Sequence, residues 1–388
     1  MINRGRLATT FKFLAEIDSV SKEEGIISGE IRGILENLGA ATYIDNAGEK
    51  TGSNTGNLIA KFQGTSPGPP LLLNAHMDTV EPGRGVKPVL KDGIFVSDGE
   101  TILGADDKSA VAILLETMRV ILENQLPHGP LELVFTVCEE IGLQGAKNLD
   151  FSLVTAEYGY ALDATDTEGI VIRAPGANRL EFKIHGKDAH AGAAPEKGIN
   201  AIVLACKAIA ELEIGRISRD TTCNIGAIEG GTAINIVPKL VTVKGEVRSH
   251  DEEILNELTE KMVLSFKNVV ENYEKPSEEG LPWLEVEVDR DFNRTHIPED
   301  HPVVSLARKA AENLGRELRT KISGGGADAN IFFEKGIMTG VLGTGMREMH
   351  SVREFVRLDD MVRTVELLLE IIRLHSGQNL SKTGSNLC

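Results

Sequence analysis

The stretch Leu-Leu-Leu-Asn-Ala-His-Met-Asp, residues 71 to 78, decides which fold this chain can adopt. Its apolar start has the length of a buried strand, and the run ends in a histidine followed two residues later by a carboxylate. Open α/β sheets carry their ligands at the carboxyl ends of such strands. His76 is therefore a candidate metal ligand, and Asp78, on the same side of the strand, can reach the second imidazole nitrogen. A histidine at a strand end is more often structural, so this motif needs partners elsewhere in the chain.

Two further strand ends supply such partners. The predicted strand from Leu131 to Val137 is followed closely by Glu139 and Glu140, and the predicted strand from Tyr158 to Leu162 ends in Asp163. Adjacent carboxylates at a strand end point in different directions, so Glu139 and Glu140 can have different roles. Three successive strand ends that carry histidine or carboxylate side chains favour one shared site at the edge of a sheet.

A fourth carboxylate position lies at the start of a helix. Asp106 and Asp107 precede a predicted helix from Ser109 to Leu122 that is apolar on nearly every face and is therefore expected to be buried. The helix macrodipole favours negative charge at this end, so a role as helix caps competes with metal binding.

Composition limits the class of protein. The 388 residues suffice for two domains and a large core, and 41% hydrophobic residues is typical of soluble globular proteins. The formal net charge of -17 argues against nucleic-acid binding, whereas an acidic cleft would also hold divalent metals. There is no visible secretory signal, no run of eighteen apolar residues and no CxxC spacing among the four cysteines. These features predict a cytoplasmic protein that does not enter a membrane.

The character of the sequence changes near Gly176. From there to Asp289 the predicted order of elements is strand, helix, strand, strand, helix, strand, which is the split βαβ or ferredoxin-like unit. We therefore expect an α/β domain made of residues 1–176 and 290–388, interrupted by an inserted α+β domain of residues 177–289. The elements predicted for the insert are Leu180 to His185, Asn200 to Leu212, Thr222 to Ile228, Leu240 to Val247, Ile254 to Val270 and Trp283 to Val288.

Taken together, the motifs resemble the two-zinc exopeptidase family that includes peptidase T, the glutamate carboxypeptidases such as carboxypeptidase G, the aminoacylases and succinyl-diaminopimelate desuccinylase. The match spans nearly the whole chain and rests on the order of the motifs, since none is decisive alone. Residues 104–108 and 324–330 are most similar to the peptidase T branch. The matching motifs are His76-Met77-Asp78, Gly104 to Lys108, Glu139 to Gly142, Asp163, Gly186 to Gly192, Asn235 to Pro238 and Met349 to Ser351.

The resemblance implies a mixed-sheet catalytic domain that holds two divalent metal ions, with the insert acting as a lid and dimerisation domain. By the family pattern, His76 and Asp163 would ligate one metal and Glu140 and His350 the other. Asp106 would bridge both metals, and the peptide bond that follows it would be cis. The mixed histidine and carboxylate ligands suit zinc, and cobalt or manganese would also be accepted.

The same pattern makes Glu139 the general base and Asp78 the partner of His76. Two divalent cations bring four positive charges, the three carboxylate ligands supply three negative charges, and a bridging hydroxide neutralises the remainder. Such a site should lower the pKa of the bound water from about 16 to near 7. Glu139 carries no metal in this scheme, so it can take the proton of the water and pass it to the departing amine.

Substrate contacts are implied mainly for the insert. By resemblance, His190 donates to the developing oxyanion, often in the active site of a dimer partner, and Asn235 and Arg248 bind the carboxylate or backbone of the substrate. Gly325, in the glycine-rich loop of the peptidase T-like segment, completes the predicted substrate-binding set. The residues alone also allow Arg248 to be a surface ion-pair partner. A homodimer formed through the insert is the expected assembly.

The predicted function is a cytoplasmic metallo-exopeptidase that hydrolyses an amide bond of small peptides, with a tripeptide aminopeptidase as the first hypothesis. An N-acyl-amino-acid deacylase or a carboxypeptidase would use the same metal chemistry. These substrate classes differ in whether the pocket pairs with the free ammonium group of the substrate or only with its carboxylate, and the sequence does not place those groups. A non-catalytic protein that binds metal or peptide is the hypothesis from a different class.

Overall fold

The computed structural model describes residues 1–274 and 280–383, and the chain packs as two compact units. The first unit comprises residues 1–172, 296–322 and 327–388, and the second comprises residues 173–295 and 323–326. The predicted insert, residues 177–289, lies within the second unit. That unit also takes in the short glycine-rich segment Ser323–Gly326, which is remote from it in the sequence.

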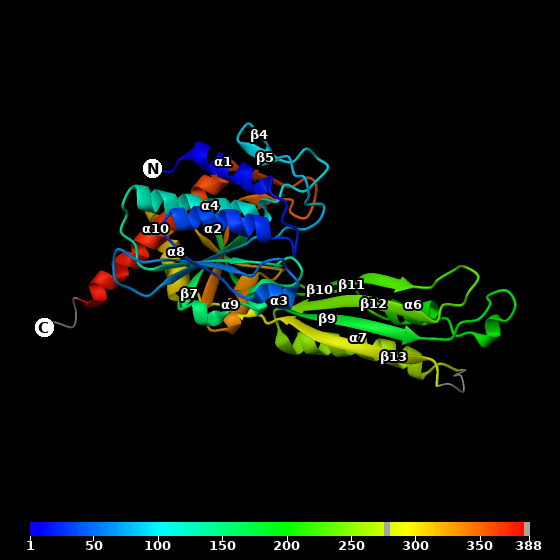
Figure 1. The fold of residues 1–388 in the computed structure, drawn as a ribbon. Coiled ribbons are helices and arrows are strands. Elements are labelled where there is room, and N and C mark those ends of the chain that lie inside the picture. Colours follow the sequence, from blue (N-terminus) through cyan, green and yellow to red (C-terminus); the bar gives the residue numbers. More distant parts are fainter. Residues whose placement is uncertain (275–279, 384–388) are drawn as a thin grey trace. The chain divides into compact units, whose positions relative to one another are not determined.

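A large mixed sheet forms the framework of the first unit (Figure 1). Its strands are β1 Ala41–Ile44, β2 Leu58–Phe62, β3 Leu71–His76, β6 Leu131–Thr136, β7 Tyr158–Ala164, β8 Gly169–Ala174, β14 Thr295–His296, β15 Arg319–Ile322 and β16 Met338–Gly343. The strand order is β1-β2-β6-β3-β7-β16-β8-β14, and β15 pairs with β8. Strand β3 runs parallel to β6 and β7, and β16 runs parallel to β7. The carboxyl ends of these four strands therefore meet at one edge of the sheet.

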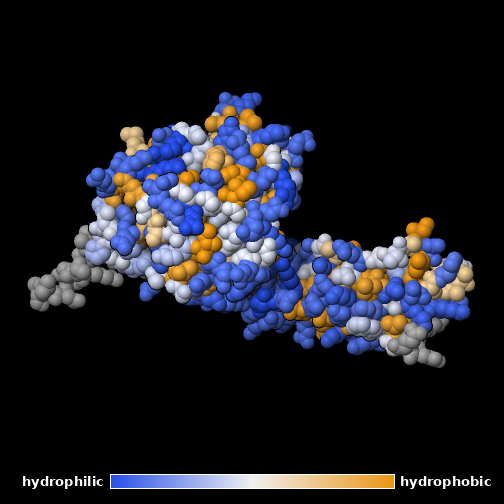
Figure 2. All heavy atoms as spheres, viewed as in Figure 1, coloured by the Kyte–Doolittle hydropathy of each residue, from blue (hydrophilic) through white to orange (hydrophobic). Residues whose placement is uncertain are grey.

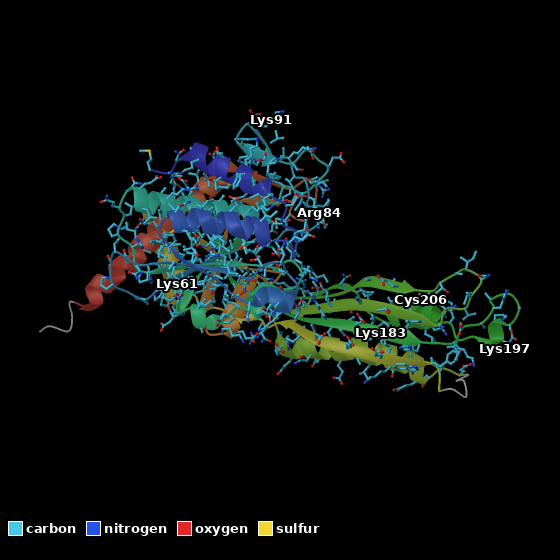
Figure 3. All side chains as sticks on the ribbon, viewed as in Figure 1. Lys61, Arg84, Lys91, Lys183, Lys197 and Cys206 are labelled. Carbon is cyan, nitrogen blue, oxygen red and sulfur yellow. The ribbon has the colours of Figure 1, made fainter. Side chains whose placement is uncertain are left out.

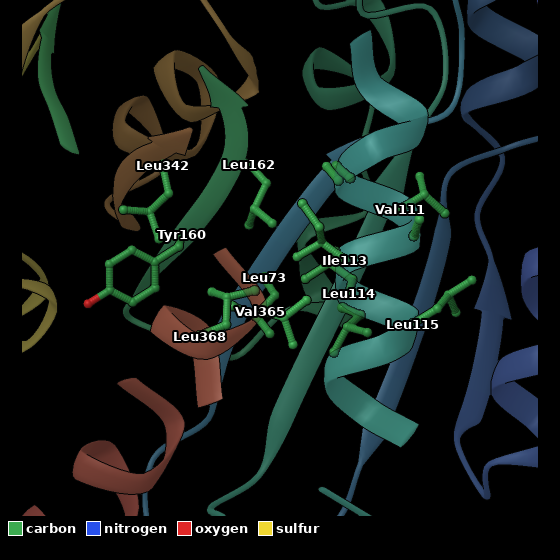
Figure 4. Packing of buried hydrophobic residues seen from close by; sticks show 14 of the residues in the cluster. Leu73, Val111, Ile113, Leu114, Leu115, Tyr160, Leu162, Leu342, Val365 and Leu368 are labelled. Carbon is green, nitrogen blue, oxygen red and sulfur yellow. The ribbon is translucent and has the colours of Figure 1, made fainter. Parts of the chain in front are cut away.

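Strand β3 is buried on both faces, which explains its unbroken apolar run. Leu71 and Leu73 belong to the core on one face, and Leu72 belongs to a second hydrophobic cluster on the other. Figure 4 shows Leu73 near Val365 and Leu368 and near side chains of helix α4 (Ala105–Glu123). Helix α4 is buried along most of its length. Successive side chains of a strand point to opposite faces, so Asn74 and His76 point to the same face as Leu72.

Helices pack on the sheet of the first unit. They are α1 Arg4–Ala15, α2 Gly25–Asn37, α3 Ala47–Thr51, α4, α5 Gln144–Lys147, α8 Pro302–Asn313, α9 Asp328–Glu334 and α10 Leu358–Thr383. Helix α4 packs against β3 and between α1 and α10. A small separate sheet joins β4 Val89–Lys91, β5 Ile94–Val96, β17 Met346–Arg347 and β18 Phe355–Arg357.

The first helix is shorter than its apolar spacing predicts. The apolar spacing from Arg6 to Val20 predicts one continuous helix, whereas α1 ends at Ala15. The hydroxyl group of Ser19 donates to the carbonyl oxygen of Met77 at 2.9 Å, and Val20 forms a parallel β-bridge with Thr79. The apolar residues after Ala15 therefore support the strand end that carries His76.

The second unit contains an antiparallel sheet in the order β10-β11-β12-β9-β13, on which two helices pack (Figure 1). Its elements are β9 Gly176–His185, α6 Ala201–Ala210, β10 Gly215–Ser218, β11 Thr221–Gly230, β12 Leu240–Ser249, α7 Glu252–Glu271 and β13 Trp283–Phe292. Strand β10 was not predicted. The inward side chains form a hydrophobic core of their own that includes Phe182 and Phe266, whose rings stack 3.9 Å apart.

The surface carries mainly polar and charged residues. Figure 2 shows hydrophilic residues with scattered hydrophobic ones on the face in view, as expected for a chain with a net charge of -17. Lys183 on β9, labelled in Figure 3, forms ion pairs with Glu181 and Glu285. None of the helices in the described residues combines the length and apolar character that crossing a membrane requires.

Candidate metal centre

Three of the predicted ligands come together at the edge of the main sheet. Ligand atoms of His76, Asp106 and Glu140 all lie within 4.8 Å of one another. His76 ends β3, Asp106 stands at the start of α4, and Glu140 follows β6. The parallel pairing of β3 and β6 places His76 opposite Thr136, so the chain after β6 emerges beside His76.

The imidazole of His76 is buried and held at both nitrogens. Its Nδ1 lies 2.9 Å from the backbone carbonyl oxygen of Asp78 and 3.4 Å from the carboxylate of the same residue, and its Nε2 lies 3.0 Å from Oδ1 of Asp106. The hydrogen bond of Nδ1–H to a carbonyl oxygen leaves the Nε2 lone pair available, which is the usual arrangement of a metal-binding histidine. Burial alone would lower the pKa of His76, but hydrogen bonding to Asp106 and Asp78, together with the charges of Glu139 and Asp107, raises it well above the ordinary value. The surrounding carboxylates thus favour positive charge at this position.

His350 approaches the same cluster from a distant part of the sequence. Its Nε2 lies 3.0 Å from Oε2 of Glu140 and 3.4 Å from Oδ2 of Asp106. Hydrogen bonds to Asp106 and Glu140 raise the pKa of His350 to about 10. The two oxygens of Asp106 therefore face different histidines, with Oδ1 toward His76 and Oδ2 toward His350. This is the arrangement that a carboxylate needs in order to bridge two cations.

Asp163 and Glu139 belong to the same electrostatic cluster. Burial raises the pKa of Asp163 well above its ordinary value, and the charge of nearby Asp106 raises it further. Burial likewise raises the pKa of Glu139, and the charges of Asp163, Asp328 and Glu140 add to the effect. So many carboxylates in a buried space repel one another, and positive charge placed among them would relieve that repulsion.

Asp78 has a larger structural role than the predicted contact with His76. Its carboxylate is fully buried, and Oδ1 accepts a hydrogen bond from the amide N–H of Glu139 at 2.9 Å. Its Oδ2 accepts from the amide N–H of Glu140 at 3.2 Å and from the hydroxyl group of Ser21 at 2.6 Å. Asp78 thus holds the backbone of both glutamates.

The peptide bond between Asp106 and Asp107 is cis, as the family resemblance implied. The carboxylate of Asp107 is buried, and its Oδ2 accepts from the amide N–H of His76 at 3.2 Å.

Asp328 was not among the predicted site residues, yet it contacts the two strands that lead into the site. It begins α9, is buried, and accepts hydrogen bonds from the Thr136 hydroxyl group and from the Asn74 side chain at 3.3 Å. Burial raises its pKa to about 6. Asp328 therefore joins β3 and β6 just before these strands deliver His76 and Glu139. The glycine-rich loop that precedes it was noticed in the sequence, but no spacing rule marks the aspartate.

The predicted substrate-binding residues lie in the second unit and form two groups. His190 and Asn235 are neighbours, because the loop of His190 bridges to Ile236 and the amide N–H of Ala191 donates to the carbonyl oxygen of Asn235 at 2.9 Å. The Nδ1 of His190 accepts from the amide N–H groups of Gly192 and Ala193, each at 3.1 Å. These contacts leave Nε2 as the protonated nitrogen of the neutral ring, able to donate.

The other group consists of Arg248 and Gly325. A Cβ atom added to Gly325 would lie 3.7 Å from a terminal guanidinium nitrogen of Arg248. The guanidinium pairs with Glu246 at 3.0 Å and stacks over Phe292, and the Nε of Arg248 has no hydrogen-bond partner among the described residues. The Nε of Arg248 is thus a buried donor to spare, and a different nitrogen of the same guanidinium lies nearest to Gly325.

The donor set fits two divalent cations. Imidazole nitrogens and carboxylate oxygens are the ligands that zinc accepts, and two histidines with three carboxylates can satisfy a pair of such ions. The orientation of His76 agrees with this chemistry, and so does Asp106, whose two carboxylate oxygens face His76 and His350.

The α/β fold and the cluster of His76, Asp106 and Glu140 agree with a metal-dependent hydrolase. The chain belongs to peptidase family M20/M25/M40, whose model matches residues 72–374, and the resemblance inferred from the motifs is thereby confirmed. It is 40% identical to YqjE of Bacillus subtilis over 96% of this chain and 99% of that protein. A tripeptidase from Staphylococcus aureus is similar in structure, with a TM-score of 0.88, 38% identity and coverage of 97% of this chain and 99% of that one. The aminopeptidase PepT from Bacillus cereus has a TM-score of 0.84, 40% identity and the same coverage.

Proposed function

We propose that this peptidase is a two-metal exopeptidase that removes the N-terminal residue of tripeptides. The observation that carries the proposal is the cluster of His76, Asp106 and Glu140 ligand atoms within 4.8 Å, beside a buried glutamate, Glu139. Two similar proteins support the choice of substrate class. One is named as a tripeptidase and the other as an aminopeptidase, and each is about 40% identical to this chain over almost its full length.

His76 and Asp163 would hold one metal ion and Glu140 and His350 the other, with Asp106 shared between them. Such a pair supplies an activated water at neutral pH and polarises the scissile carbonyl group. Zinc is the proposed metal, with cobalt or manganese as substitutes. Elemental analysis of protein purified without added metal would identify it, and a content well below two equivalents of transition metal would contradict the proposal.

Glu139 is the proposed general base. The amide N–H of Glu139 is fixed by Asp78, so the direction in which its side chain leaves the strand end is set by a buried carboxylate. The carboxylate of Glu139 would accept a proton from the attacking water and later deliver it to the departing amino group. Glu139→Gln keeps the size of the side chain and removes the proton acceptor, so kcat should fall by about a hundredfold or more. The metal content should not change.

His190 and Asn235 are proposed to act in the active site of a second copy of the chain. Leu240 pairs with His185 at one end of β12, and Arg248 pairs with Ala177 near the other end. Eight residues of strand span about 26 Å, and an extended tripeptide spans only about 10 Å. A tripeptide is therefore shorter than the separation along β12 between Arg248 and the end of the sheet from which the His190 loop extends.

A homodimer resolves this mismatch, because the His190 of each copy can serve the substrate held by the other. In this scheme Nε2–H of His190 donates to the developing oxyanion, and Arg248 with the backbone at Gly325 receives the substrate carboxylate. In this proposal the second unit is a ferredoxin-like lid and dimerisation domain. A fully active monomer in sedimentation experiments would contradict this assembly.

A free tripeptide assayed beside its N-acetylated form tests the substrate class. An aminopeptidase cleaves the free peptide and releases its first residue, whereas a deacylase acts only on the acetylated compound. Release of the last residue instead would identify a carboxypeptidase. Activity confined to the acetylated form would overturn the aminopeptidase proposal and leave the metal centre intact.

A non-catalytic metal-binding or peptide-binding protein is the second candidate. It predicts that Glu139→Gln leaves any measured activity unchanged. The cytoplasmic location is likewise a proposal, to be tested by fractionation of cells that produce the protein.

A further inference from the structure

A buried glutamate, Glu354, holds the backbone that carries Asp106. Its side chain is 1% exposed and lies four residues beyond His350. Oε2 of Glu354 accepts hydrogen bonds from the amide N–H groups of Leu103 and Gly104, both at 2.7 Å, and Oε1 accepts from the amide N–H of Asp106 at 2.9 Å. Asp106 and Glu354 stand 248 positions apart in the sequence.

These three amides need an acceptor outside their own turn, because Leu103 and Gly104 precede α4 and Asp106 lies in its first turn. The first N–H groups of a helix lack intrahelical acceptors, and here the backbone at Asp106 and Asp107 departs from helical geometry, with ψ of 99° at Asp106. Gly104 adopts a left-handed conformation with φ of +72°. The turn that aims the Asp106 side chain is therefore irregular, and one carboxylate accepts from three of its N–H groups.

The same glutamate is fixed to the segment that presents His350. Its own amide N–H donates to the carbonyl oxygen of Ser351 at 3.1 Å, and β18 begins at the next residue, where Phe355 pairs with Val96 of β5. The His350 turn is thus anchored at its base by the small sheet. Through Glu354, this turn and the Asp106 turn are held against each other.

We propose that Glu354 is a positioning residue of the metal centre, which sets the Asp106 carboxylate at a fixed place relative to His350. The inference rests on the proposed function, since it assumes that Asp106 and His350 share a cation. It assigns to Glu354 no contact with metal or substrate. Its effect passes through the backbone of Asp106.

The chemistry of the three hydrogen bonds predicts which substitution isolates this role. Glutamine keeps one oxygen, which can continue to accept from Leu103 and Gly104, and its NH₂ group would then face the N–H of Asp106. Two donors cannot bond to each other, so Glu354→Gln perturbs the backbone at Asp106 in particular. Glu354→Asp retains the charge but is one methylene shorter, so it separates the loss of geometry from the loss of charge.

Glu132 offers a matched control in the same unit. It is also a buried glutamate, and its Oε2 accepts from the amide N–H groups of Thr155 at 2.8 Å and Ala156 at 3.0 Å. It pairs with Lys61, labelled in Figure 3, and contacts none of the proposed ligands. Glu132→Gln therefore removes the same kind of buried backbone contact without touching the Asp106 turn.

The experiment measures Zn²⁺ binding by full-length protein in competition with a chromophoric chelator, together with the visible spectrum of the Co²⁺-loaded protein. Glu354→Gln and Glu354→Asp should each raise the Kd for metal by about 10- to 100-fold and shift the Co²⁺ spectrum. Glu132→Gln should leave both unchanged even where it lowers the Tm of the metal-free protein.

Unchanged metal affinity in Glu354→Gln would overturn the proposal, as would equal weakening by Glu132→Gln. Full retention of affinity in Glu354→Asp would also overturn it, because charge alone would then explain the effect. If Glu354→Gln does not fold, the metal affinity of Glu354→Asp decides the test. Failure of the wild-type protein to bind any divalent metal would instead remove the proposed function itself.

Discussion

Replacing Asp78 with asparagine should cost this protein both stability and metal affinity, because a single buried carboxylate holds the backbone of two glutamates. One carboxylate oxygen accepts from the amide of Glu139 and the other from the amide of Glu140 and the hydroxyl group of Ser21. Asparagine has nearly the same shape, but one of its two terminal groups is a donor. In either orientation of the side chain, at least one of the two amides would face an NH₂ group.

The magnitude follows from these contacts. A buried N–H left without an acceptor costs about 1–3 kcal/mol, and the remaining hydrogen bonds lose the benefit of a charged acceptor, which adds about 1 kcal/mol. We therefore expect the free energy of unfolding to fall by about 2–4 kcal/mol. Displacement of Glu140, a proposed ligand, should raise the Kd for Zn²⁺ by about 10- to 100-fold, the usual effect of losing a residue that orients a ligand.

The assay combines chelator-competition titration of Zn²⁺ with thermal unfolding in excess chelator. Ser21→Ala is the matched control, since it removes the hydroxyl contact with Asp78 and leaves both amide contacts in place. An unchanged Kd for Zn²⁺ in Asp78→Asn would refute the reasoning. Equal weakening of metal binding by Ser21→Ala would refute it as well, because the amide contacts would then not be responsible.

Three further predictions concern the whole fold. Removal of metal by a chelator should lower Tm. Adding Zn²⁺ to about 100 times its Kd should then raise the free energy of unfolding by about 2.7 kcal/mol, and a Tm that does not change with Zn²⁺ would contradict a bound-metal centre. Gly159→Ala should destabilise strongly in urea, because its Cβ would lie 2.2 Å from the carbonyl oxygen of Leu72, whereas Gly33→Ala, with open space in α2, should stabilise by about 0.5–1 kcal/mol. Burial lowers the pKa of His375, so below a pH of about 6.5 the unfolded chain binds more protons than the folded chain, and the free energy of unfolding falls. His375→Gln should make the free energy of unfolding depend less on pH in urea titrations between pH 7 and pH 5.

The strands and long helices were predictable because their signals are local. The apolar run at Leu71 predicts β3. The short run from Leu58 to Phe62, which follows a loop of Gly, Ser and Asn residues, also predicts a strand and matches β2 residue for residue. Strands β4, β5, β14, β17 and β18 escaped prediction, since pieces of two or three residues are too short to show a period. The longer strands β1, β8, β10 and β15 were not predicted either. The extension of α1 beyond Ala15 was predicted wrongly, because residues 17–20 have helical apolar spacing but are used to brace the end of β3.

For the site, the sequence by itself determined which chemical groups stand at strand ends and in what order along the chain. It could not determine that Asp78 binds two backbone amides, that Asp328 joins β3 to β6, or that Glu354 accepts from the turn of Asp106. Such contacts leave no periodic trace, because a buried carboxylate is recognised only by the donors around it. Those donors come from segments as many as 254 positions away in the sequence, and only tertiary packing brings them within hydrogen-bonding distance.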